Sequence, residues 1–276
     1  MANVLPREKQ IAIISMLAEG SSMRAISRMT GIHGDTICRL GVRIGKGCAS
    51  LLDHKMRGLS CENLQLDEIW GFIGKKQKHV VEDDDPTKGD VWTFCAIDAE
   101  TKLVPAFKVG KRTAETANAF VGDLAGRLNN RVQISTDGLK AYVEAVENAF
   151  GMDVDYAMII KNYGQDIGLH HQERRYSSPS VLSSEKIHIV GRPNMELCST
   201  SYVERLNGTT RLHMRRLTRL THAFSKKFEN FEAAVALHFA YYNFVRRHAS
   251  LRCTPAMAAG VERSFWTVGD LVEAVS

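Results

Sequence analysis

The 276-residue sequence has no uninterrupted run of 18 apolar residues, and no uninterrupted apolar region of the length found in signal peptides follows the basic residues near its amino terminus. A membrane-spanning helix needs about 20 such residues, and a secretion signal needs a continuous apolar centre. We therefore expect no membrane span and no secretion signal, and we expect the protein to stay in the cytoplasm.

The sequence also lacks any pair of cysteines in CxxC spacing. Its six cysteines are scattered along the chain, at Cys38, Cys48, Cys61, Cys95, Cys198 and Cys253. Zinc ribbons and small disulfide frameworks both need closely spaced cysteines, so this pattern argues against either. Reduced thiols in a cytoplasm are the simpler interpretation.

One segment lacks acidic residues altogether. Between Arg205 and Phe228 there is no Asp or Glu, whereas the whole chain carries a net charge of only +5. A mildly basic chain fits a nucleic-acid partner without demanding one, but positive charge concentrated in one segment is more informative. We call residues 205–228 the basic segment; its cationic residues are Arg205, Arg211, Arg215, Arg216, Arg219, Lys226 and Lys227.

Residues 1–59 have helical spacing throughout. One helix follows Arg7, "EGSS" ends it, "MRAISRMTG" forms a second short helix that ends at Gly31, and a third begins near Gly34. Two short helices joined by a glycine turn are typical of a helix-turn-helix DNA-binding domain, although a plain three-helix cap has the same pattern. A histidine stands where a Ser or Thr cap is usual, which weakens the start of the third helix. In the helix-turn-helix interpretation, the side chains of the third helix that would enter a DNA groove are those of His33, Asp35, Thr36 and Arg39.

From residue 60 to 250 strands and helices are mixed. "LQLDEIWGFIG" alternates as a strand, "DVWTFCAIDAETKLVPAFKVG" as two strands around a turn, and "RVQISTDG" and "VDYAMIIKNYG" as two more, with helices before and after "RVQISTDG". This order predicts a mixed α/β sheet with flanking helices. Residues 165–195 are polar and read as an inserted loop or β-excursion, and a long helix rich in apolar residues precedes a C-terminal tail at 251–276.

Two aspartates mark the ends of expected central strands. Asp67 interrupts the first strand between Leu66 and Ile69, and Asp137 follows "VQIST". Taken singly, Asp67 reads as a solvent contact at a strand end and Asp137 as a turn former. Together, at the ends of neighbouring strands, their carboxylates can meet, and a cation then relieves their repulsion. Hard oxygen ligands favour magnesium or manganese.

Glu204 directly precedes the basic segment on an expected helix. Helical spacing puts Glu204, Asn207 and Arg211 along one edge, so the carboxylate can complete a metal site while the guanidinium binds a phosphate. The alternative is a solvated charged face. The run "NGTT" within this helix argues against a purely structural element, because these residues are poor helix formers.

These motifs resemble the DDE transposases of bacterial insertion sequences, which are RNase H-like enzymes, and most closely the family of insertion sequence one and its relatives. The resemblance spans about residues 65–260 and rests on "QLDEIWGFIG", "ISTDG", "SYVERLNGTTR" and "YYNFVRRHASLRCTPAMAAG". It implies a five-stranded RNase H-like sheet with the first Asp on the first strand, the second after the fourth strand, and the Glu on a following helix. The family's three catalytic, metal-binding carboxylates fall on Asp67, Asp137 and Glu204, its amide on Asn207, and its basic residue on Arg211.

The resemblance implies cleavage at transposon ends and transfer of the freed 3′-hydroxyl to target DNA, with two Mg²⁺ or Mn²⁺ ions as cofactors. The partners implied are double-stranded DNA, as terminal inverted repeats and as target, and a homodimer or higher assembly in a bacterial nucleoid. A nuclease that cuts without joining and an inactive DNA-binding regulator are the alternatives. The residues expected to contact DNA are His33, Thr36, Arg39, Asn207, Arg211, Arg215, Arg216, Arg219, Lys226, Lys227 and His248.

Other ionisable residues are left outside the predicted site. Asp98 belongs to a hairpin turn, "EDDDP" at residues 82–86 reads as a solvated loop, and Glu68 should face the side of its strand opposite to Asp67. His170, His171 and His188 in the insert suit DNA contact or plain exposure better than metal binding. His248 either caps the end of the long helix or approaches DNA.

Overall fold

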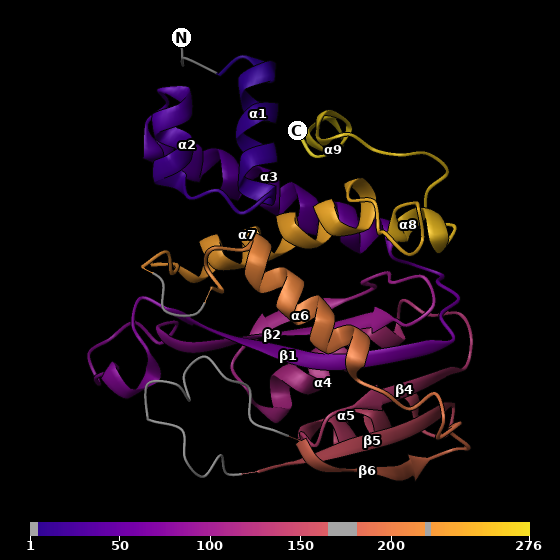
Figure 1. Cartoon of the computed structure of the whole chain (residues 1–276). Helices are drawn as coiled ribbons and strands as arrows, with labels where there is room; N and C mark the ends of the chain where they lie inside the picture. The colour runs from indigo at the N-terminus through magenta and orange to yellow at the C-terminus, as the bar shows by residue number, and fades with distance from the viewer. Residues whose placement is uncertain (1–4, 165–180, 219–221) are drawn as a thin grey trace.

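The amino-terminal region forms three helices, α1 (Arg7–Ala18), α2 (Met23–Thr30) and α3 (Gly34–Lys55), in a computed structural model that describes residues 5–164, 181–218 and 222–276 (Figure 1). Ser22 caps α2 by accepting from the Ala25 amide, and Gly31 ends it with a φ of 71°. His33 caps α3, since its Nδ1 accepts from the Asp35 amide at 3.3 Å. The expected weakness at the start of the third helix is therefore a wrong expectation, because an imidazole nitrogen replaces the usual hydroxyl.

A mixed sheet of six strands, in the order β3-β2-β1-β4-β5-β6, forms the centre of the molecule. β1, β2 and β3 pair antiparallel, β4 is parallel to β1 and β5 to β4, and β6 returns antiparallel to β5. The predicted mixed α/β class is confirmed, with one strand more than the expected five. The strands are β1 (Asn63–Ile73), β2 (Gly89–Asp98), β3 (Phe107–Gly110), β4 (Val132–Thr136), β5 (Val154–Tyr163) and β6 (Val181–Val190).

The additional strand, β6, comes from the polar segment at 165–195, which was expected as a loop or β-excursion. Most of its side chains are exposed, as suits an edge strand, and this is why its apolar pattern is weak. Residues 165–180 lie outside the described part of the chain.

Helices cover both faces of the sheet (Figure 1). Helices α4 (Ala114–Ala125) and α5 (Ala141–Phe150) pack together behind it, while α6 (Ser201–His213) crosses β1 and β2 in front. The Thr113 side chain caps α4 as expected, by accepting from the Thr116 amide. Shorter elements complete the chain: a 3₁₀ turn at Gln77–His79, a π-helical turn at Tyr241–Val245, α8 (Pro255–Ala258) and α9 (Val268–Ala274).

Helix α7 (Phe228–Ala240) joins the amino-terminal helices to the sheet by packing along α3 (Figure 1). The contact is close at Gly45, where a Cβ atom would lie 2.1 Å from the carbonyl oxygen of Ala233, so a larger residue would push the helices apart. One continuous hydrophobic core includes residues of α3, the sheet, α7 and α9. The domain boundary near residue 59 stays a prediction.

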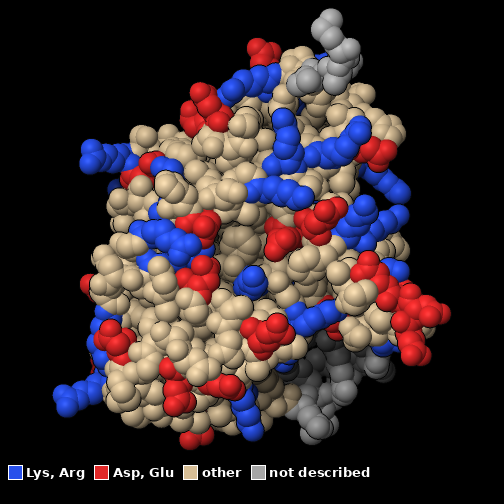
Figure 2. Space-filling view, turned by 180° about the vertical axis from the view of Figure 1, so that it is seen from behind, with Lys and Arg blue, Asp and Glu red and all other residues tan. Residues whose placement is uncertain are grey.

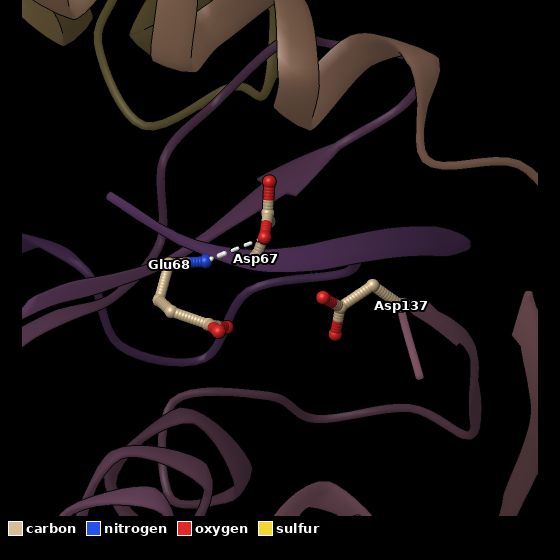
Figure 3. Close-up of side chains that lie close together, drawn as sticks. All are labelled: Asp67, Glu68 and Asp137. Atoms are coloured by element: carbon tan, nitrogen blue, oxygen red, sulfur yellow. Dashed lines mark hydrogen bonds between the residues drawn. The ribbon is translucent and has the colours of Figure 1, made fainter. Parts of the chain in front are cut away.

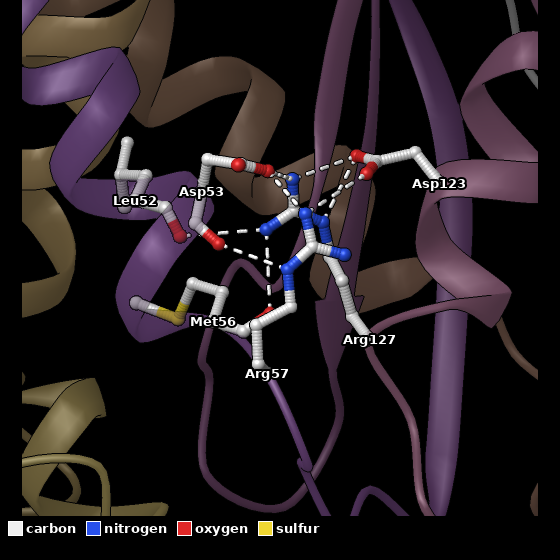
Figure 4. A network of polar contacts seen from close by, with 6 residues as sticks. All are labelled: Leu52, Asp53, Met56, Arg57, Asp123 and Arg127. Carbon is white, nitrogen blue, oxygen red and sulfur yellow. Dashed lines mark hydrogen bonds and ion pairs between the residues drawn. The ribbon is translucent and has the colours of Figure 1, made fainter.

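Arg127 fixes the carboxyl end of α3 to α4 (Figure 4). Its guanidinium donates to the carbonyl oxygens of Leu52 and Met56 and pairs with Asp53 and Asp123, each at 2.9 Å. A cation at this position satisfies carbonyl groups that a helix end leaves unpaired.

Within the described ranges, no helix is both long and apolar enough to cross a bilayer. All six cysteines are free, and four of them are buried.

Candidate metal centre

Strand β1 holds helix α6 through two side chains on the same face. Gln65, which is 1% exposed, accepts with its Oε1 from the backbone amides of Tyr202 and Val203 at 2.8 and 3.2 Å. Two residues further along β1, Asp67 accepts with Oδ2 from Nδ2 of Asn207 at 2.7 Å. Gln65 thus caps α6 from outside the helix, where its own N-cap residue Thr200 makes no capping bond.

Asp137 directly follows β4, and its Oδ1 accepts from the Leu139 amide at 3.1 Å, which closes the turn. Strand β4 runs parallel to β1, with Thr136 beside Leu66. The next residue on each strand is an aspartate, so the sheet register itself brings Asp67 and Asp137 together. Each of these two and Glu68 offers a carboxylate oxygen within 4.8 Å of those of the other two (Figure 3).

Glu68 lies in this acidic cluster, although the sequence analysis left it outside the predicted metal site. Asp67 and Glu68 leave β1 on opposite sides, as expected, but Asp137 points into the space between them (Figure 3). The Glu68 carboxylate pairs with Arg112 at 2.6 Å and accepts from the Tyr142 hydroxyl at 3.2 Å. Its place next to Asp67 in "LDEIW" was the signal available in the sequence.

The cluster concentrates negative charge away from water. Burial, followed by the charges of Glu68 and Asp137, raises the pKa of Asp67 to about 7. Burial and Asp137 also raise the pKa of Glu68, against the opposing effect of Arg112. Clustered carboxylates with raised pKa values are a donor set that suits a hard divalent cation, which would relieve their repulsion.

Glu204 lies on α6 as predicted but outside this cluster. Its Oε1 pairs with the Nζ of Lys161 on β5 and accepts from the Thr200 hydroxyl at 2.6 Å, and its side chain is 47% exposed. It still lies near enough to Asp67 to contribute to the raised pKa of that carboxyl. Sequence reasoning missed Lys161, a cation that follows the apolar centre of β5.

Arg211, about two turns beyond Glu204 on α6, donates from Nη1 to the carbonyl oxygen of Leu217 at 2.8 Å. The hydroxyl of Thr218 in turn donates to the carbonyl oxygen of Arg211 at 3.1 Å. These bonds hold the turn that follows α6, so the guanidinium contacts this turn rather than the acidic cluster.

Other residues of the basic segment also bind the protein itself. Arg215 donates from Nε to the carbonyl oxygen of Gly20 at 3.0 Å, and Arg216 donates from Nη1 to the Ser225 hydroxyl at 2.6 Å. The end of α6 packs against the turn between α1 and α2, where Arg215 takes part in the contact, whereas Arg216 contacts the segment that precedes α7. Lys226 and Lys227 are exposed, and Arg219 lies outside the described residues.

The residues predicted to contact DNA from the amino-terminal helices lie at the surface. His33 and Arg39 are exposed and Thr36 is half-buried. His248 shares a hydrogen bond with the Ser250 hydroxyl at 2.9 Å, and burial together with Lys102 and other cations lowers its pKa. The contacts of these residues with DNA stay predictions.

The remaining ionisable residues have local roles. Asp98 accepts from the amide and hydroxyl of Thr101, and Asp84 of the "EDDDP" run pairs with Lys75 and Lys88 at 2.6 and 2.9 Å. His188 bonds to the carbonyl oxygen of Gly191 at 2.8 Å. His170 and His171 lie outside the described part of the chain.

The face of the molecule behind the sheet carries Lys, Arg, Asp and Glu side chains intermixed (Figure 2). The described residues on this face form no broad surface of one sign. Helix α6, which begins the basic segment, crosses the opposite face (Figure 1). A long acidic polymer would find no continuous electrostatic footprint on the rear face.

No protein-family model matches this sequence, and no curated protein matches it. Among solved structures, the piggyBac transposase synaptic complex with hairpin DNA is similar with a TM-score of 0.40 and 10% identity, over 96% of this chain and 68% of that chain. The Mos1 transposase paired-end complex with left transposon end is similar with a TM-score of 0.24 and 13% identity, over 56% of this chain and 60% of that chain. The Mos1 strand transfer complex is similar with a TM-score of 0.24 and 10% identity, over 88% of this chain and 78% of that chain.

Proposed function

We propose that this protein is a DNA transposase of a bacterial insertion sequence, which cleaves DNA at the element ends and joins the freed 3′-hydroxyl to target DNA. The observation that carries the proposal is the meeting of Asp67 and Asp137 from parallel central strands under a helix that bears Glu204 and Asn207. Carboxylates from separate elements around one point are typical of metal-assisted phosphoryl transfer.

Asp67, Asp137 and Glu204 would hold two Mg²⁺ or Mn²⁺ ions, with Glu68 close enough to serve as a further ligand or to balance charge through Arg112. Bound divalent ions would polarise the scissile phosphate and lower the pKa of an attacking hydroxyl or water. A bound cation would lower the raised pKa values of Asp67 and Glu68 and so favour their ionised forms.

The chain's own residues position these groups. Asn207 orients Asp67 through its amide, and Gln65 holds the first turn of α6 so that Glu204 stays above the sheet. Lys161 neutralises Glu204 in the absence of ions, and it would become available for a DNA phosphate once Glu204 binds metal.

Double-stranded DNA is the proposed partner, both as terminal repeats and as target. His33, Thr36 and Arg39 would contact bases from a helix-turn-helix, and Lys226, Lys227 and His248 would contact phosphates. Joining two element ends calls for a homodimer or larger assembly.

A cleavage and strand-transfer assay on matched element ends with Mg²⁺ tests the proposal. Asp137→Asn should abolish both reactions and preserve DNA binding, while Asp153→Asn, at a carboxylate that is 81% exposed, should keep both. Cleavage that survives in Asp137→Asn would refute the metal assignment. Cut ends without a joined product in the unmodified protein would point to a nuclease, and binding without cleavage to a regulator.

A further inference from the structure

A cavity of about 550 Å³ lies where α2 and α3 meet the end of α6 and the start of α7. Four of the residues that line it are cationic, namely Arg24, Arg215, Arg216 and Lys226, and no Asp or Glu is among its described lining residues. The four come from separate parts of the chain: one from α2, two from the turn after α6, and one from the approach to α7. Folding therefore gathers positive charge here that no single helix presents.

The structure leaves this charge unpaired. None of the ion pairs between described residues includes Arg24, Arg215, Arg216 or Lys226. The partners of Arg215 and Arg216 are neutral, a carbonyl oxygen, a hydroxyl and the Cys38 thiol. Burial lowers the pKa of Arg216. A guanidinium taken out of water without a carboxylate is costly, and an anionic ligand would offset that cost.

The rest of the cavity is largely apolar. Leu17, Ile37, Phe224 and Leu237 contribute to its wall, and the Phe224 ring packs on Phe72 with 4.9 Å between ring centroids. Inorganic phosphate would contact the arginines and leave this wall uncovered. A ligand with both an anionic group and a planar, weakly polar body would use both parts, and the volume falls within the range of about 300 to 1,000 Å³ that is usual for small-molecule sites.

We propose that this cavity binds one nucleotide unit, with its phosphate at the four cationic side chains and its base against the apolar wall. The unit comes either from a DNA strand, as a nucleotide turned out of the duplex, or from a free nucleotide. The site lies apart from the acidic cluster and is built from other residues. Its test measures binding alone, so it stands or falls separately from the proposed DNA cleavage.

Calorimetric titration of the full chain with deoxyadenosine monophosphate tests the site. We expect saturable binding that is weaker for deoxyadenosine and for inorganic phosphate. Arg24→Glu and Lys226→Glu should each weaken binding roughly tenfold, since each removes a charge-assisted contact. The matched controls are Arg28→Glu, an exposed residue on the same helix as Arg24, and Lys9→Glu, an exposed lysine on α1; neither lines the cavity. Both controls should leave nucleotide binding within about twofold of the unmodified protein.

Two DNA duplexes distinguish the sources, one fully paired and one with a single bulged 2-aminopurine whose fluorescence reports its surroundings. If the 2-aminopurine fluorescence changes on binding, and Arg24→Glu abolishes this change while Arg28→Glu does not, the site binds an unstacked nucleotide of DNA. Binding of the free nucleotide with no response from the bulge assigns it to a free ligand. The proposal is overturned if neither probe binds at millimolar concentration, if phosphate alone binds as tightly as the nucleotide, or if the controls lose as much affinity as the cavity variants.

Discussion

The side-chain amide of Asn207 donates to Oδ2 of Asp67 over 2.7 Å, and this bond ties the middle of α6 to the central strand β1. The Oδ1 atom of the same amide lies 3.6 Å from the Cys95 thiol, in hydrogen-bonding range of that donor. Asn207 is thereby held on two sides, and its amide fixes the direction of one carboxylate in the acidic cluster. A residue that orients a metal ligand in this way controls metal affinity without touching the metal.

Asn207→Ala should therefore weaken the binding of Mn²⁺ by roughly tenfold or more, as loss of such an outer contact usually does. Calorimetric titration with Mn²⁺ measures the change directly. Thr209→Ala, at a half-buried position on the same helix, is the control and should bind Mn²⁺ as the unmodified protein does. Equal affinity in Asn207→Ala and the unmodified protein would show that Asp67 needs no orienting partner.

Lys161 should compete with metal ions for Glu204. In Lys161→Met the Glu204 carboxylate loses its ammonium partner, so Mn²⁺ should bind more tightly, by up to about fivefold, because a half-exposed ion pair contributes less than about 1 kcal/mol. The control is Lys186→Met on the adjacent strand β6, since Lys186 donates to the carbonyl oxygen of Met195. If both variants change Mn²⁺ affinity alike, the effect is only the loss of a positive charge.

Much of the sheet was predictable because its strands carry their own apolar pattern. The strand that bears Asp67 and the strand that precedes Asp137 are both predicted by their alternating apolar residues. Asp67 was expected at the end of its strand, but it lies in the middle of β1, and it meets Asp137 because β4 ends beside Leu66. The edge strand β6 was less visible, since an exposed strand has no buried face to mark it in the sequence.

The rest of the site could not be predicted because it depends on contacts between distant segments. Gln65 caps a helix that begins more than 130 residues later, and Lys161 meets Glu204 across a gap of 43 residues. Helical spacing predicted correctly which residues lie on α6, but spacing alone does not say what a face will meet. Arg216, for example, was expected to contact DNA because it belongs to the basic segment. In the structure it is half-buried and donates to the Ser225 hydroxyl.

Arg127 should contribute more to stability than any exposed ion pair, because it is only 9% exposed and bonds to the end of α3 as well as to two carboxylates. Arg127→Met leaves those groups without their donor and should lower the free energy of unfolding by about 3 kcal/mol. Urea unfolding followed by circular dichroism measures this. Arg57→Met, in the same network but 44% exposed, should cost less than about 1 kcal/mol (Figure 4). Similar losses in both variants would contradict the role of burial.

The buried His238 should make the fold sensitive to mild acid. Burial, His213 and Arg246 lower its pKa in the folded protein to about 3, from the usual 6.5. Between these values the unfolded chain binds one proton more than the folded chain. The free energy of unfolding therefore falls by about 1.4 kcal/mol for each pH unit below 6.5. This loss of stability comes from protonation of the His238 imidazole, so it should disappear when residue 238 cannot take up a proton.

The variant His238→Gln should remove this acid-dependent loss of stability. The Thr210 hydroxyl donates to the carbonyl oxygen of Leu206, so His238 donates from Nε2 to Thr210, and a glutamine amide can keep that bond. Between pH 6.5 and 5 the unmodified protein should lose about 2 kcal/mol more than His238→Gln, as measured by urea unfolding at each pH. His33→Gln, at a side chain that is 78% exposed, is the control and should lose stability as the unmodified protein does. An acid response in His238→Gln equal to that of His33→Gln would mean that His238 is not the group that titrates.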